Sequence, residues 1–173
     1  FLFLGRKTQR KGVIDWLSGK WGYPTEAPEK AVFPIKLSIG IVNYKTLGLT
    51  KKLLKSIYSQ PAEIVENLEV ILLDNASDDG CKDVVEKEFP QVKFIQNEEN
   101  NGFAGGYNQT IDYSKGEYYL MLNSDIEVLP GSLDKMLKIE DKMGADAVLA
   151  GKLFLPDGTV QKSCFTLPTI GGA

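Results

Sequence analysis

Short apolar runs alternate with amphipathic segments along most of the chain. The apolar runs cover residues 37–43, 68–74, 92–96 and 118–123, and polar or glycine-rich sequence bounds each of them. Runs of this length and composition are typical of strands that are buried on both faces, as in a parallel sheet. The pattern therefore predicts four buried strands.

Between these runs, apolar residues recur at helical spacing. The first amphipathic helix is predicted to end near Gln60 and Pro61, with apolar positions at Leu49, Leu53, Leu54 and Ile57. Further helices are predicted before Pro90, from about residue 104 to 114, and after Pro130. Strands that alternate with helices indicate an α/β fold with a mostly parallel, Rossmann-like sheet and right-handed crossovers.

The two ends of the chain lack this alternation. Residues 12–34 hold two tryptophans and three prolines without a period, so they predict a linker or a surface arm. Residues 147–155 predict a strand that returns through a turn as a hairpin with residues 159–165. We expect a basic arm over residues 1–34 and one domain over residues 35–173.

Polar residues follow three of the four predicted strands. If the strands take the doubly wound order 3-2-1-4, the first and fourth lie side by side, and a ligand binds outside their carboxyl ends. Those ends carry Asn43 and Tyr44, Asp74 and Asn75, and the sequence Asn-Ser-Asp at 123–125. The sequence therefore predicts a ligand site of the kind that a nucleotide requires.

The segment 74–80 reads Asp-Asn-Ala-Ser-Asp-Asp-Gly. A carboxylate that follows a buried strand can accept hydrogen bonds from a pyrimidine base or from ribose hydroxyls. The alternative is a purely structural role, because Asp, Ser and Gly also form turns and helix caps. We predict that Asp74 faces a ligand, whereas Asp78 and Asp79 cap the next helix.

Three glycines lie in the segment 100–108, just before or inside a predicted helix start. Glycine permits a close approach of the backbone, and helix N-terminal amides favour phosphate. The segment matches neither GxGxxG nor a P-loop, which weakens the dinucleotide and ATP hypotheses. The alternative is a flexible loop without a ligand.

The end of the fourth predicted strand offers oxygen ligands for a cation. Asp125, with substrate phosphates, would suffice for Mg²⁺, which usually binds one or two carboxylates and keeps other positions for substrate. Glu127 is either a second acidic group or a solvent-facing residue. The alternative for the whole segment is a solvated loop.

Composition excludes several classes of function. The net charge is −3, and residues 1–36 carry seven basic and three acidic residues, so the main body is acidic. Duplex nucleic acid is therefore not an expected partner. The chain has no histidine, which excludes His-based triads and His metal sites. Its two cysteines, Cys81 and Cys164, form no CxxC and no disulfide framework.

Both ends look like cuts through a longer protein. Four apolar residues at 1–4 cannot span a bilayer, which needs roughly 20. They are either the end of a membrane helix with a cytoplasmic basic flank or part of a loose arm, and the sequence leaves both open. Residues 169–173 complete no helix or strand.

Four segments together resemble the family-2 glycosyltransferases with a GT-A fold, in particular a rhamnosyltransferase-like branch. They cover residues 38–44, 72–80, 97–108 and 122–128, and the segment 151–169 is similar to the next segment of that branch. The resemblance implies inverting transfer of a sugar from a dTDP-, UDP- or GDP-sugar to a glycan or lipid-linked acceptor. It also implies a role in bacterial cell-envelope polysaccharide synthesis, in the cytoplasm or at the inner face of the membrane.

The resemblance also implies roles for individual residues. Asp74 would contact the base, and Asp125 would hold Mg²⁺ or Mn²⁺. The nucleotide pocket would include Asn43, Tyr44 and Asn75, and the sugar and diphosphate pocket would include Asn101, Gly102, Phe103, Asn108 and Asn123. Asn123 replaces the first Asp of the family's DxD-type motif, which removes one charge from the metal site.

Inversion needs a general base for the acceptor hydroxyl. The resemblance implies a carboxylate downstream of this chain, and Asp157, in a predicted turn, is a poor substitute. We therefore expect a donor-binding half with little or no transfer by itself. The alternatives are a nucleotide-sugar-binding fragment without catalysis, or a sugar nucleotidyltransferase, which would need a basic glycine-rich loop after the first strand.

Overall fold

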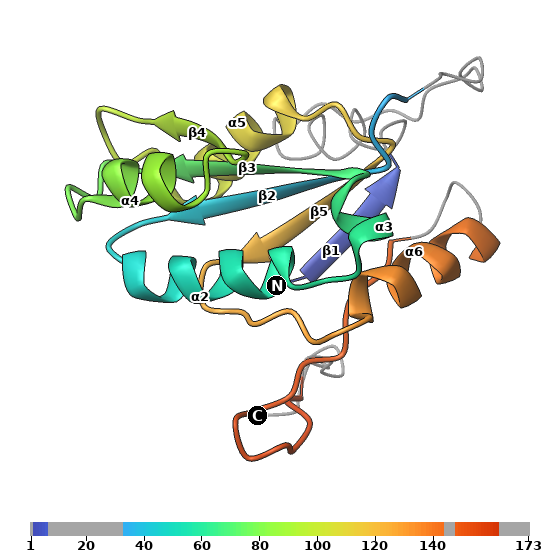
Figure 1. Cartoon of the computed structure of the whole chain (residues 1–173). Coiled ribbons are helices and arrows are strands. Elements are labelled where there is room, and N and C mark those ends of the chain that lie inside the picture. Colours follow the sequence, from blue (N-terminus) through green and yellow to red (C-terminus); the bar gives the residue numbers. More distant parts are fainter. Residues whose placement is uncertain (1, 7–32, 144–147, 163–173) are drawn as a thin grey trace, which may run out of the picture.

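A computed structural model describes residues 2–6, 33–143 and 148–162 of the chain (Figure 1). The strands are β1 (Leu2–Arg6), β2 (Leu37–Asn43), β3 (Leu68–Asp74), β4 (Lys93–Gln96) and β5 (Tyr118–Asn123). The helices are α2 (Leu47–Tyr58), α3 (Ala62–Val65), α4 (Cys81–Glu88), α5 (Gly102–Tyr113) and α6 (Ser132–Met143). The predicted alternation of strands and helices is confirmed.

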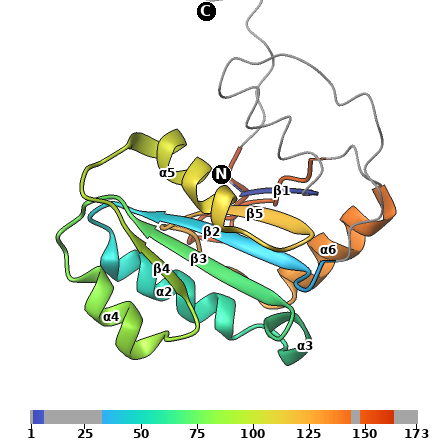
Figure 2. The ribbon, with the colours of Figure 1, turned by 90° about the horizontal axis from the view of Figure 1, so that it is seen from above.

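The five strands form one sheet in the order β1-β5-β2-β3-β4, which Figure 2 shows from above. The pairs β2–β3, β2–β5 and β3–β4 are parallel, so the assumed order of the four predicted strands is correct. Asn43 is in register with Asp74, and Val42 with Asn123. The carboxyl ends of β2, β3 and β5 therefore lie together at one edge of the sheet.

The hydrophobic pattern does not predict β1. This strand pairs antiparallel with β5, with Leu2 opposite Leu122 and Arg6 opposite Tyr118. The expectation of an arm is wrong for residues 2–6, because five residues are too few to show a period and only the partner strand reveals them. The rest of the predicted arm, residues 7–32, lies outside the described residues.

Helices cover both faces of the sheet. One face packs against α2, α4 and α6, whose buried side chains form the main core with the odd-numbered residues of β2, including Ile39 and Ile41. The other face carries α5, which lies above the sheet in Figure 1 and contacts β2 and β3. Each fully buried aliphatic side chain of this core contributes about 1.5–3 kcal/mol relative to exposure.

Two predicted elements differ from the structure. Helix α5 begins at Gly102, before the predicted start near residue 104, so all three glycines of the segment 100–108 lie in the helix. Of the predicted hairpin, the described residues show an antiparallel bridge between Phe154 and Val160 around the turn at Gly158, where a longer strand was expected. Residue 147 and residues 163–173, with Cys164, lie outside the described residues. Among the described helices, none is long and apolar enough to cross a membrane.

Candidate functional site

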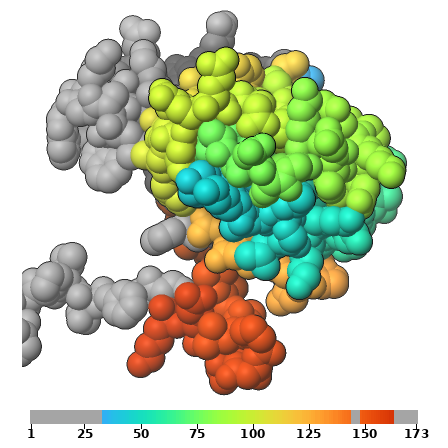
Figure 3. All heavy atoms as spheres, turned by 90° about the vertical axis from the view of Figure 1, so that its left-hand side faces the viewer, coloured from blue at the N-terminus to red at the C-terminus, as the bar shows by residue number. Residues whose placement is uncertain are grey.

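The carboxyl edge of the sheet holds an open pocket of about 410 Å³. This edge faces the viewer in Figure 3, where the segments coloured blue-cyan, green and yellow meet. Six of the ten predicted site residues line the pocket: Tyr44, Asn75, Gly102, Phe103, Asn123 and Asp125. The parallel register explains this, because it brings residues from four distant segments to one place.

Two exposed aromatic side chains lie at this pocket. Tyr44, in the loop after β2, is 45% exposed, and Phe103, in the first turn of α5, is 54% exposed. The Phe103 ring contacts the Tyr107 ring at a centroid distance of 4.7 Å. Tyr107 is buried and its hydroxyl donates to the carbonyl of Leu122 at 2.7 Å, which fixes Phe103 relative to β5. Exposed aromatic faces at a pocket can stack on a planar or apolar ligand.

Asp125 is the acidic group of the pocket. It is exposed, and no hydrogen-bond donor contacts its carboxylate within the described part of the chain. Its neighbour Ser124 lies 2.9 Å from the Thr46 hydroxyl and donates to it, because the Thr46 proton goes to Asn43 Oδ1; this bond ties the end of β5 to the loop after β2. Asp125 is therefore held in place by its backbone while its oxygens remain available to a ligand.

Asn43 is not among the residues that line this pocket, and its contact with a nucleotide stays a prediction. Its side chain is completely buried and forms hydrogen bonds on both sides of the amide. Its Nδ2 donates to Asp74 Oδ1 at 2.6 Å and to Ser77 Oγ at 3.0 Å, and its Oδ1 accepts from Thr46 and Thr50 at 2.9 Å. Asn43 thus joins the loops beneath the pocket.

Asp74 is 2% exposed and accepts three hydrogen bonds from the protein. Besides Asn43, the donors are the Ser77 backbone N–H at 3.0 Å and Gln96 Nε2 at 2.7 Å. Burial by itself would raise the pKa of Asp74, but these hydrogen bonds outweigh it and lower the pKa below its usual range. Contact between Asp74 and a base stays a prediction.

Asn75 connects the end of β3 to the start of α5. Its Nδ2 donates to Asn100 Oδ1 at 2.7 Å and to the Gly102 carbonyl at 3.2 Å. Its Oδ1 accepts from Asn97 Nδ2 at 3.0 Å and from the Asn101 backbone at 3.1 Å. The position of the N-terminus of α5 at the pocket therefore depends on this one buried amide.

Two further predicted site residues lie outside the lining of the pocket, and their contact with a donor stays a prediction. Asn101 precedes α5 and is exposed, and Asn108 lies along α5, but neither lines the pocket. The Asn108 Oδ1 is buried and has no hydrogen-bond partner among the described residues. Six residues that line the pocket are not among the predicted site residues: Val42, Thr46, Leu49, Asn100, Tyr107 and Ser124. Tyr107 lies within the glycine-containing segment, but its spacing resembles that of an ordinary core residue.

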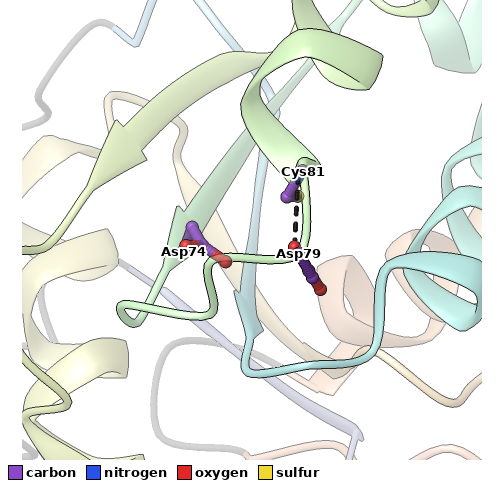
Figure 4. A group of neighbouring side chains, drawn as sticks. All are labelled: Asp74, Asp79 and Cys81. Atoms are coloured by element: carbon purple, nitrogen blue, oxygen red, sulfur yellow. Dashed lines mark hydrogen bonds between the residues drawn. The ribbon is translucent and has the colours of Figure 1, made fainter.

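A second pocket, of about 400 Å³, lies beside Asp74. Figure 4 shows three of its residues, Asp74, Asp79 and Cys81, whose potential ligand atoms lie within 4.8 Å of one another. Burial raises the pKa of the Cys81 thiol to about 12, and the two carboxylates add to this effect. A metal binds the thiolate, and both carboxylates already accept hydrogen bonds from protein. In the described structure both carboxylates serve as hydrogen-bond acceptors for the neighbouring loops.

Cys81 is expected to resist alkylation in the folded chain. At pH 8, its raised pKa reduces the thiolate fraction on the order of 10²-fold or more relative to an ordinary thiol. Mass spectrometry of the Cys81 peptide after iodoacetamide treatment, with and without urea, measures this protection. Equal labelling in both conditions would contradict the buried environment of the thiol.

Comparison with known proteins identifies the family. The family model described as glycosyl transferase family 2 matches residues 38–163. The chain belongs to this family. It is 26% identical to the GalNAc(5)-diNAcBac-PP-undecaprenol beta-1,3-glucosyltransferase of Campylobacter jejuni, over 79% of this chain and 49% of that protein. It is also 26% identical to the N-acetylglucosaminyl-diphospho-decaprenol L-rhamnosyltransferase of Mycobacterium tuberculosis, over 60% of this chain and 37% of that protein.

Solved structures confirm the GT-A fold of this family 2 chain. Staphylococcus aureus TarS (residues 1–349) is 26% identical to it, with a TM-score of 0.56 over 62% of this chain and 33% of TarS. The TarS complex with UDP-GlcNAc has the same TM-score, at 25% identity, over 62% of this chain and 32% of that one. The chain spans about half, or less, of the length of these relatives.

Proposed function

We propose that this chain binds a nucleoside diphosphate-sugar and forms the donor half of the active site of an inverting glycosyltransferase. The observation that carries the proposal is the pocket at the carboxyl edge of the sheet, where Tyr44, Phe103 and Asp125 come together. Family membership supports it, as do relatives named as a glucosyltransferase and a rhamnosyltransferase. TarS, of the same fold, is described in complex with UDP-GlcNAc.

The pocket offers different chemistry to different parts of such a donor. Tyr44 and Phe103 present aromatic faces to the base and to the apolar side of the sugar ring. Gly102 and Phe103, at the N-terminus of the twelve-residue helix α5, also line the pocket. Helix N-terminal amides and the helix dipole favour the negatively charged diphosphate there.

A divalent cation fits the charge of this site. None of the described residues that line the pocket is basic, so this lining offers no side-chain cation to a diphosphate. Asp125 would hold Mg²⁺ or Mn²⁺ with one carboxylate, and Asn123 adds an amide without a charge. When bound, the cation neutralises the charge that develops on the diphosphate leaving group.

The acceptor is proposed to be a glycan or a lipid-linked sugar of a bacterial cell-envelope polysaccharide. The names of two relatives include undecaprenol and decaprenol diphosphates, which supports a lipid-linked acceptor. With an acceptor of this kind, the protein is proposed to act in the cytoplasm or at the inner face of the cell membrane. The donor nucleotide is proposed to be a uridine, thymidine or guanosine diphosphate.

Calorimetry tests the donor site. The chain is titrated with UDP, dTDP and GDP, each with Mn²⁺ and with EDTA. We expect binding of at least one nucleotide in Mn²⁺ and at least tenfold weaker binding in EDTA, because Asp125 repels an uncompensated diphosphate. The absence of binding by all three nucleotides would refute the proposed donor site.

Sugar transfer by this chain alone is expected to be undetectable or very slow. Asp157 is an exposed acidic residue of the hairpin, and the Thr159 hydroxyl and backbone hold its pKa below the usual range. A general base works best with a pKa near the operating pH, which Asp157 does not have. A turnover assay with several nucleotide-sugars and a lipid-linked acceptor measures this, and robust transfer would show that the chain contains its own base.

A further inference from the structure

We propose that Asp79 is a positioning residue of the donor site, which fixes the loop after β2 and thereby holds Tyr44 against the bound nucleotide. Asp79 does not line the pocket that contains Tyr44 and Asp125. Its action is therefore indirect, through hydrogen bonds to the neighbouring loop. This inference rests on the proposed function, because it assumes that Tyr44 contacts the donor.

The Asp79 carboxylate lies at the N-termini of two helices. Its Oδ2 accepts a hydrogen bond from the Leu47 backbone N–H, the first residue of α2, at 3.2 Å. Its Oδ1 accepts from the Cys81 backbone N–H, the first residue of α4, at 3.1 Å. A carboxylate is favoured at a helix N-terminus, and here two helix dipoles act on the same group.

Helix α2 depends on this contact because its own N-cap residue does not supply one. Thr46 makes no side-chain capping bond; its hydroxyl donates instead to Asn43 Oδ1. The N-terminal amides of a helix need an acceptor, and Asp79 from a different loop provides it. The start of α2, directly after the segment with Tyr44, is thereby tied to the start of α4.

Further hydrogen bonds tie the residues on both sides of Tyr44 to the same loop. The Lys45 backbone N–H donates to Ser77 Oγ at 3.0 Å, and Asn43 Nδ2 donates to Asp79 Oδ2 at 3.2 Å. The Asn43 carbonyl accepts from the Asn75 backbone at 2.9 Å. The residues before and after Tyr44 are thus both hydrogen-bonded to the loop between β3 and α4, which holds the backbone of Tyr44 in place.

The backbone conformation shows that these contacts impose a constraint. Lys45, Ala76 and Asp78 have φ values of 56°, 61° and 51°, in the left-handed region that side chains other than glycine disfavour. Such conformations persist only where the surroundings enforce them, and they occur at functional sites. Both loops that Asp79 joins contain at least one of these residues, so loss of the contact would let the loop of Tyr44 relax.

The Tyr44 side chain makes few other contacts that would fix its position. Its side chain is 45% exposed, and no hydrogen bond from its hydroxyl is found among the described residues. The Lys45 Nζ lies 5.4 Å from its ring centroid, but Lys45 belongs to the same loop and would move with it. The place of the ring is therefore set by the backbone, and the backbone by Ser77 and Asp79.

A double-mutant cycle tests the inference on the full 173-residue chain. Asp79→Asn, Tyr44→Ala and the double variant are titrated with Mn²⁺ and whichever of UDP, dTDP or GDP the unmodified chain binds best. We expect each single variant to bind about tenfold more weakly, and the double variant to bind like Tyr44→Ala. Additive losses, which a general structural role would give, would overturn the inference.

Asp83→Asn is the matched control, because Asp83 is an exposed carboxylate in the first turn of α4 with no hydrogen bond to the other described residues. It is expected to bind the nucleotide like the unmodified chain. If Asp79→Asn does not fold, Ser77→Ala, which removes the acceptor for Lys45, enters the same cycle. Unchanged affinity in Asp79→Asn or in Tyr44→Ala overturns this inference alone. An unmodified chain that binds no nucleotide overturns the proposed function as well.

Discussion

Replacement of Asp125 by alanine is expected to abolish the cation-dependent binding of a nucleoside diphosphate. Asp125 is the carboxylate of a pocket that has no basic residue among its described lining. Without it, the described lining of the pocket has no carboxylate to hold the cation that compensates the diphosphate. We expect affinity in Mn²⁺ to fall at least about tenfold, and EDTA to weaken the binding by this variant little further, because no cation is held.

Glu127→Ala is the control for this prediction. Glu127 lies two residues further along the chain, is also exposed and carries the same charge, but it does not line the pocket. Its replacement is expected to leave nucleotide affinity within about twofold, because exposed charges away from a ligand contribute little. If both variants bind alike, the cation is held elsewhere and the assignment of Asp125 is wrong.

The parallel part of the fold could be predicted because its signal is local. Strands buried on both faces require continuous apolar runs, and these stand out between polar turns. β1 could not be predicted, since the identity of an edge strand depends on its partner. The start of α5 could not be predicted either, because glycines disfavour helix. In the structure, the buried Asn75 amide fixes the backbone of Asn101 and Gly102 at this start.

The sequence predicts where the candidate site lies better than it predicts which side chains contact one another there. The ends of three strands carry polar residues, and the parallel register brings them to one edge. Whether such a residue faces a ligand or a neighbouring loop depends on which donors surround it. Asn43 meets Thr46, Thr50 and Ser77, so its amide is buried, whereas Asp125 meets none among the described residues. The spacing of residues in the sequence cannot predict this difference between a buried amide and an exposed carboxylate.

Gly40→Ala is expected to destabilise the chain by roughly 3–5 kcal/mol, because it combines overpacking with disruption of a buried hydrogen bond. Gly40 lies in the central strand β2, under α5. A Cβ there would meet Tyr119 Oη, and would lie 2.6 Å from Thr110 Oγ1 and 2.7 Å from Tyr119 Cζ. These two hydroxyls form a buried hydrogen bond of 2.6 Å, so neither side chain can move away freely.

Urea denaturation measures the effect, with Gly48→Ala as the matched control. Gly48 lies in the first turn of α2, and a Cβ there would have no heavy atom within 4 Å among the contacts considered. The same substitution is expected to stabilise α2 by up to about 1 kcal/mol, since alanine favours helix over glycine. Because α5 also carries Phe103 to the pocket, Gly40→Ala should weaken nucleotide binding as well. A loss of stability below about 1 kcal/mol would mean that α5 does not approach β2 as closely as described.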